Sequence, residues 1–145
     1  MSRFVLAEAE RLAGRYAAAE AEYRRAIESA SRQQGLLVRG LHAGLADCLA
    51  RLGREVEAEA EFREEIALIP YSREARVGLG LLFRSQGRDA EARDALAGIV
   101  TANPRAGAEE YVVVARTLAT IGDVEAAREW ASRGRALYPK DARLR

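Results

Sequence analysis

The sequence predicts an all-helical protein built from repeated helix pairs, and three observations carry this prediction. Of the 145 residues, 49% are apolar and 31% are charged, a balance that excludes a disordered chain. Good helix formers dominate, whereas β-branched residues never alternate with polar ones over the length of a strand. The third observation is a short glycine motif that recurs along the whole chain.

The motif is a glycine followed closely by a charged residue, with an alanine five residues after the glycine. It occurs at Gly14, Gly53, Gly87 and Gly122, at spacings of 39, 34 and 35 residues. An apolar stripe of helical period lies on each side of every glycine, so each unit is expected to be two amphipathic helices around a short turn. The glycine permits the left-handed backbone that ends the first helix.

Each of the eight expected helices is supported by its own apolar stripe. The expected ranges are 2–13, 17–33, 36–51, 55–69, 72–86, 89–101, 106–120 and 124–137. In the same order, the stripes are marked by Leu6 and Ala7, Tyr23 and Ala26, Leu45 and Leu49, Phe62 and Ile66, Leu79 and Phe83, Leu96 and Ile99, Val114 and Leu118, and Ala131 and Leu137.

Prolines end three of the four units, at Pro70, Pro104 and Pro139. Between the first two units the spacing is five residues too long, so we expect helices 17–33 and 36–51 to be extended. A single helix pair cannot bury its apolar face, and the pairs must therefore stack.

These in-phase units resemble tetratricopeptide repeats, whose period is about 34 residues. The resemblance implies a right-handed α-solenoid of four helix-turn-helix units in one domain, residues 1–145, with repeats at about 2–34, 35–71, 72–105 and 106–140. The chain departs from the family pattern at Arg3, His42 and Arg76, which fill an early position where tryptophan is common and where Tyr111 is aromatic. A further departure is Glu65, which replaces a small residue.

In this family the first helices of the repeats line a concave groove that binds an extended or helical peptide. The Lys and Asn positions of the family's carboxylate clamp hold other residues here, so we do not expect binding of chaperone tails. Apolar groove positions rimmed by arginine suit an amphipathic helix or an apolar peptide with acidic flanks. By register, the resemblance places in the groove Phe4, Glu8, Arg11, Ala43, Asp47, Arg51, Val77, Leu81, Arg84, Val112 and Arg116.

The residue types argue against an enzyme, a metal site or a cofactor. His42 is the only histidine, so no His-based triad or His–His metal pair can form, and we expect it to pack between helices. Cys48, the only cysteine, is expected to be a buried structural thiol. The glutamate-rich helix 55–69 is expected to be a solvated face supported by a Glu59–Arg63 pair.

Charge and hydropathy narrow the partners and the location. A net charge of +1 gives no attraction for nucleic acid or for an anionic membrane. No apolar run is long enough for membrane insertion, and the N-terminus lacks the segments of a signal peptide, so a cytoplasmic location is favoured. Every basic residue except Lys140 is arginine, which we attribute to a bacterial-type genomic composition.

The sequence thus favours a non-catalytic scaffold that binds a peptide or helix of a partner protein. The alternative is self-association, as a homodimer or as a docking domain of a larger protein, through the last repeat. Repeat arrays usually need a polar capping helix, and only residues 140–145 follow Pro139. An apolar segment, residues 36–38, is a second reason for that alternative.

Overall fold

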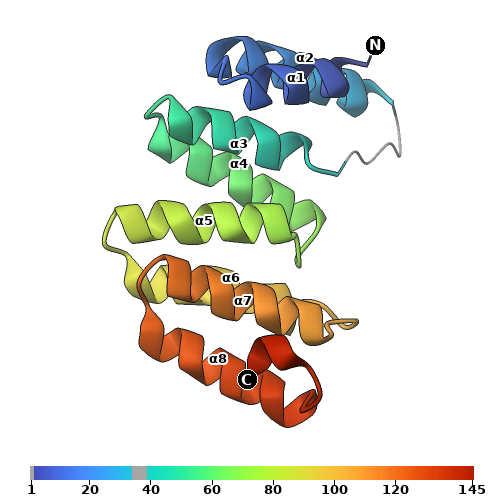
Figure 1. Cartoon of the computed structure of the whole chain (residues 1–145). Helices are drawn as coiled ribbons and strands as arrows, with labels where there is room; N and C mark the ends of the chain where they lie inside the picture. Colours follow the sequence, from blue (N-terminus) through green and yellow to red (C-terminus); the bar gives the residue numbers. More distant parts are fainter. Residues whose placement is uncertain (1, 34–38) are drawn as a thin grey trace. The chain divides into compact units, whose positions relative to one another are not determined.

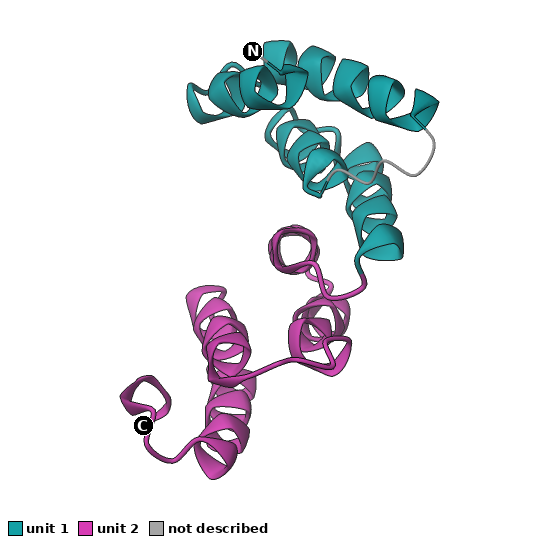
Figure 2. Cartoon of the chain, turned by 90° about the vertical axis from the view of Figure 1, so that its right-hand side faces the viewer, with its two compact units in different colours: residues 1–69 teal, residues 70–145 magenta. Residues whose placement is uncertain are grey.

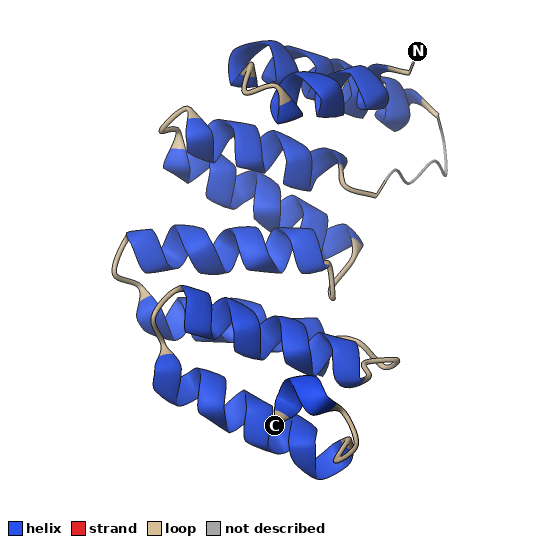
Figure 3. Cartoon of the chain, in the orientation of Figure 1, coloured by secondary structure: helices blue, strands red, loops and turns tan. Residues whose placement is uncertain are grey.

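The computed structural model describes residues 2–33 and 39–145, which form eight α-helices, one short 3₁₀ helix and no strand (Figures 1 and 3). The predicted all-α class is confirmed. The chain divides into two compact units, residues 1–69 and 70–145, coloured teal and magenta in Figure 2. The division lies beside the junction expected between the second and third repeats.

Each unit contains two helix pairs. In unit 1, α1 (Arg3–Leu12) packs on α2 (Tyr16–Arg32), α2 packs on α3 (Leu41–Arg51), and α3 packs on α4 (Glu55–Leu68). In unit 2, α5 (Arg73–Ser85) packs on α6 (Asp89–Thr101), α6 on α7 (Ala108–Thr120), and α7 on α8 (Val124–Leu137). The 3₁₀ helix η1 (Ala142–Leu144) then packs on α8.

The four predicted turns share one geometry. Each motif glycine has a positive φ, between 73° at Gly87 and 87° at Gly122, which an L side chain rarely adopts. The residue after each glycine donates its backbone N–H to the carbonyl five residues earlier, at 2.8 to 2.9 Å. This hydrogen bond closes the end of the first helix and turns the chain into the second.

In each repeat, the residue at the early position contacts a residue of the second helix that lies 19 positions later in the sequence. Arg3 pairs with Glu22 at 3.4 Å, and His42 Nδ1 lies 2.6 Å from a carboxylate oxygen of Glu61. Arg76 donates to the carbonyl oxygen of Ala95 at 3.1 Å. In the fourth repeat the rings of Tyr111 and Trp130 lie 5.8 Å apart. The residues that depart from the family pattern therefore fill its position with a different chemistry in each repeat.

One helix start differs from the expectation. Helix α2 has 17 residues and is extended as predicted, but α3 begins at Leu41 rather than at residue 36. Gly40 has a φ of 94°, which cannot continue a right-handed helix, so α3 starts immediately after it. The apolar segment 36–38 lies outside the described residues.

Glu65 explains why α3 can begin there. This glutamate is 1% exposed, and its carboxylate accepts hydrogen bonds from the backbone N–H groups of Gly40 (3.2 Å) and Ala43 (3.0 Å). It thus pairs donors of the first turn of α3 that the helix itself leaves free. A residue noted in the sequence as a departure is a cap supplied from the neighbouring helix.

Candidate peptide-binding surface

The eleven residues predicted to line a groove fall into two sets, one in each unit. Unit 1 holds six of them, and four of those six form one polar cluster. Unit 2 holds five, three of which are exposed. The two sets differ in how far their charges are already satisfied.

The unit 1 cluster is centred on Arg11. Its guanidinium donates to Glu8 at 2.8 Å and to Asp47 at 3.1 Å, and so joins α1 to α3. The hydroxyl of Tyr23, a residue of α2, donates to Glu8 and accepts from Arg11 Nε at 3.2 Å. On the other side, Arg51 lies 3.5 Å from Asp47 and stacks over the Tyr16 ring.

These contacts shift the ionisation of the cluster. Burial tends to raise the pKa of Glu8, but hydrogen bonds from Arg11 and Tyr23 outweigh it and lower that pKa. Burial and the nearby Glu8 raise the pKa of Tyr23 above its ordinary value. Two acids and two arginines balance each other, so the cluster leaves little net charge to attract a ligand.

Tyr23 is the member of this cluster that the groove register missed. The register uses only first helices, whereas Tyr23 comes from the second helix of the first repeat. Its ring is fully buried against Gly44, where a Cβ atom would lie only 2.4 Å from the ring. The sequence signal that could have found it is this glycine opposite a large aromatic residue.

Two predicted groove residues have no surface to offer a partner. Ala43 is 5% exposed and Val112 is 1% exposed, so both belong to the core rather than to a groove. Val77, at the equivalent position of the third repeat, is partly buried and packs against the core cluster that contains Val114 and Leu118. Phe4, at the equivalent position of the first repeat, is half-buried beside Gly40. This register position is buried in the second and fourth repeats and half-buried in the first and third.

Unit 2 presents the remaining three residues on its surface. Leu81 of α5 is 47% exposed, and Arg116 stands at the equivalent position of α7. Arg84 pairs with Asp89 at 2.8 Å, and its guanidinium also reaches the turn after α7, 3.5 Å from where a Cβ of Gly122 would lie. An exposed leucine is therefore accompanied by two arginines. Unit 2 carries 13 basic and 10 acidic side chains, a net charge of +3.

The C-terminal end is more covered than expected. Leu144 of η1 is 1% exposed and lies against Gly134 of α8, which Tyr111 also approaches. Arg143 holds η1 in place through ion pairs with Asp141 at 2.7 Å and with Glu109 at 2.5 Å. The six residues after Pro139 thus cover part of α8, which corrects the expectation that the last pair has no cover.

The other residues considered in the sequence, His42, Cys48 and Glu59, are either buried or paired with a neighbouring side chain. His42 is half-buried, and its hydrogen bond to Glu61 raises its pKa. Cys48 is buried, which raises the pKa of its thiol to about 11. The expected Glu59–Arg63 ion pair is present at 2.9 Å.

The described residues offer neither a cluster suited to a metal ion nor a helix suited to crossing a membrane. Across residues 2–33 and 39–145, no group of three or more His, Cys, Asp or Glu side chains is placed to hold a metal ion. Within the same part of the chain, no helix combines the length and the apolar character needed to cross a membrane.

Comparison with known proteins shows which proteins this chain resembles in sequence and in fold. A family model described as tetratricopeptide repeat matches residues 70–107, and no curated protein matches the chain. Among solved structures, YrrB, a tetratricopeptide repeat protein with an unusual peptide-binding site, is similar at a TM-score of 0.57 and 19% identity over 95% of this chain and 68% of YrrB. A tetratricopeptide repeat protein from Parabacteroides merdae is similar at a TM-score of 0.61 and 16% identity. This match covers 98% of the present chain but only about half, 53%, of the other.

Proposed function

We propose that this chain, a tetratricopeptide repeat protein, is a non-catalytic module that binds an acidic amphipathic segment of a partner protein. Proteins of this family generally serve as interaction scaffolds rather than enzymes. The binding surface that we propose consists of Leu81, Arg84 and Arg116 on the first helices of unit 2. We call it the α5–α7 surface.

The observation that carries this proposal is the exposed Leu81, with Arg84 three residues later on α5 and Arg116 at the register-equivalent position of α7. An isolated exposed leucine is ordinary on a protein surface, but one flanked by cations can contact an apolar side chain and a carboxylate of the same ligand. No ion pair joins Arg116 to an acid in the part of the chain that the structure describes. In unit 1 the equivalent positions hold Glu8 and Asp47, both engaged by Arg11.

Arg84 also has a partner, Asp89, so the chemistry of the ligand follows chiefly from the exposed Leu81 and from Arg116. A helix with an apolar stripe and acidic flanks would bury Leu81 and place its carboxylates near Arg84 and Arg116. The net charge of +3 on unit 2 would speed the approach of such a segment and make the association weaken at high salt.

The test is selection of binders by the purified full chain from a displayed library of random amphipathic helices. We expect enriched sequences to combine an apolar stripe with Asp or Glu, and the double variant Leu81→Ser/Arg84→Gln to lose their binding. The matched control is Val124→Ser/Arg128→Gln, which changes an exposed aliphatic residue and an exposed arginine on α8. Circular dichroism checks that both variants keep their helicity. Equal binding by both double variants would refute the assignment of the α5–α7 surface.

Self-association is a second candidate, and exposed apolar side chains of α1 support that helix as its surface. On α1, Val5, Ala9 and Leu12 are exposed and share one apolar stripe. Val5 is the register equivalent of Gly44, which in the second repeat packs against the preceding helix. Light scattering over a concentration series tests this candidate, since Leu12→Glu should abolish any dimer that forms through α1.

A further inference from the structure

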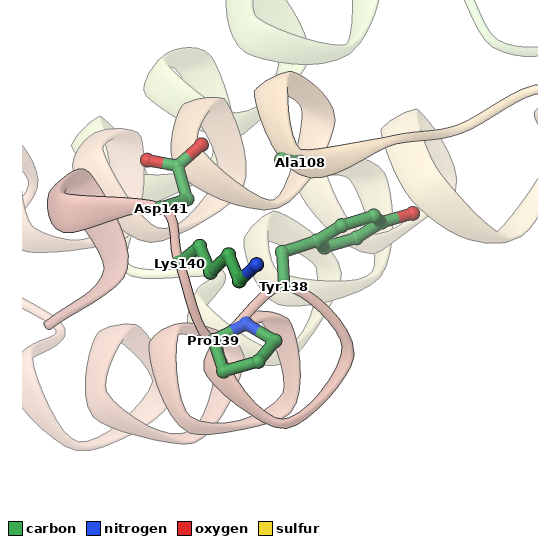
Figure 4. A pocket seen from close by; sticks show the side chains of 5 residues that line it. All are labelled: Ala108, Tyr138, Pro139, Lys140 and Asp141. Atoms are coloured by element: carbon green, nitrogen blue, oxygen red, sulfur yellow. The ribbon is translucent and has the colours of Figure 1, made fainter.

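A hollow of about 420 Å³ opens at the C-terminal end of unit 2, and none of the three residues of the α5–α7 surface lines it. Its lining is almost entirely apolar and consists of Ala108, Tyr138, Pro139, Lys140 and Asp141. Figure 4 shows the Lys140 side chain lying between Tyr138 and Asp141, with its ammonium end on the Tyr138 side. The first residue of α7, Ala108, faces this segment from above in the same view.

Hydrogen bonds and ring contacts hold the walls of the hollow in place. The backbone N–H of Tyr138 donates to Gly134 at 2.7 Å, and its ring lies 6.0 Å from that of Tyr111. The N–H of Asp141 donates to the carbonyl of Tyr138 at 3.1 Å. A site whose walls are fixed before binding loses less entropy when a ligand enters.

The charge at the rim is unbalanced. The carboxylate of Asp141 accepts hydrogen bonds from Arg143, which lower the pKa of that carboxyl to about 2. Lys140, by contrast, has no ion pair with an acid among the described residues. The hollow therefore has an apolar floor, formed by two rings and a methyl group, and a free ammonium at its edge.

We propose that this hollow binds a peptide of a partner protein in which a large apolar side chain stands next to an aspartate or glutamate. The apolar side chain would fill the space over Tyr138, Pro139 and Ala108, and the neighbouring carboxylate would pair with Lys140. This site shares no lining residue with the α5–α7 surface and does not require the proposed function of that surface.

The test uses the full chain and three acetylated, amidated tetrapeptides as probes. Gly-Phe-Asp-Gly carries both features, whereas Gly-Ser-Asp-Gly lacks the apolar side chain and Gly-Phe-Asn-Gly lacks the charge. Backbone amide shifts of Tyr138, Lys140 and Asp141 in nuclear magnetic resonance titrations give the affinity. Lys140 is the only lysine, so isotope-labelled dimethylation, which keeps its charge, adds a side-chain signal at the site. We expect the first peptide to move these signals at lower concentration than either control.

Two variants separate the apolar contact from the charge. Ala108→Leu fills the hollow from the half-buried first residue of α7 and should weaken binding about tenfold or more, as expected when a phenylalanine side chain loses its apolar contact. Lys140→Gln should weaken it about two- to fivefold, the range of an exposed ion pair.

The matched control is Arg128→Gln, a cation of α8 outside the hollow, which should bind as the wild type does. The variant Leu81→Ser/Arg84→Gln should also keep this binding, so that failure of one site is distinguishable from failure of the other. Equal shifts with all three peptides, or undiminished binding by Ala108→Leu, would overturn the proposal.

Discussion

Replacing Glu65 by alanine tests whether a side chain of α4 controls the start of α3. The substitution removes two hydrogen bonds, of 3.2 and 3.0 Å, and leaves the N–H groups of Gly40 and Ala43 without a partner. Hydrogen bonds to a charged group contribute about 1.5–3 kcal/mol each, but burying the carboxylate opposes them. We therefore expect a net loss of about 2–4 kcal/mol in the free energy of unfolding, which includes the loss of a helix cap.

The assay is urea unfolding followed by circular dichroism. With an m-value of about 1–3 kcal/mol per molar urea, a loss of about 3 kcal/mol lowers the midpoint by about 1–3 M. The control is Glu64→Ala, an exposed glutamate one position away, which should change stability by less than about 0.5 kcal/mol. Hydrogen exchange adds a local readout, since the amides of Gly40 and Ala43 should lose protection in the Glu65 variant.

If Glu65→Ala unfolds at the same urea concentration as Glu64→Ala, the capping argument is wrong. Retained protection of the Gly40 and Ala43 amides would lead to the same conclusion, because those donors would then have another partner.

Three further predictions concern packing and pH. Gly44→Ala should destabilise by about 1–2 kcal/mol in urea melts, because a Cβ 2.4 Å from the buried Tyr23 ring costs more than the helix gains from alanine; a more stable variant would show that the ring can move. Pairing with Glu61 raises the pKa of His42, so its stabilising effect is complete below pH 6.5 and is lost as the pH rises through the raised value. The urea midpoints of wild type and His42→Gln should thus differ more at pH 5.5 than at pH 9, and a difference independent of pH would contradict this. Leu144→Ser should lower the free energy of unfolding by about 2–4 kcal/mol, as measured by Trp130 fluorescence during urea unfolding. An unchanged urea midpoint would mean that η1 does not stabilise α8.

Local rules were enough to predict the helices, because their signals lie within a few residues of one another. Glycine at each turn and proline after three of the pairs fixed the ends to within about two residues, with the start of α3 as the exception. That start depends on Gly40 and on Glu65, which is 25 residues away in the sequence. A contact between residues this far apart produces no periodic pattern in the sequence, so Glu65 could be identified there only as a departure from the family pattern.

The site was predicted less completely, since transferring a register assumes that equivalent positions face the same way. The position shared by Ala43, Val77 and Val112 is apolar in every repeat, a pattern typical of the core rather than of a variable groove. The next position along the register holds Glu8, Asp47, Leu81 and Arg116, and this change in chemistry marks a surface. Comparing how much the residue type varies at each position would have distinguished the core position from the surface position.

The pairs 19 residues apart have a consequence for anyone who recombines these repeats. Arginine with glutamate, histidine with glutamate, arginine with a carbonyl group and tyrosine with tryptophan occupy the same place in four successive units. If an arginine such as Arg3 replaced Tyr111 alone, for example, its guanidinium would face the indole of Trp130, which now packs on the tyrosine ring. The four repeats share a backbone but differ in this contact. In the first, second and fourth repeats both residues of the pair would have to be exchanged together, whereas Arg76 needs only a backbone carbonyl group.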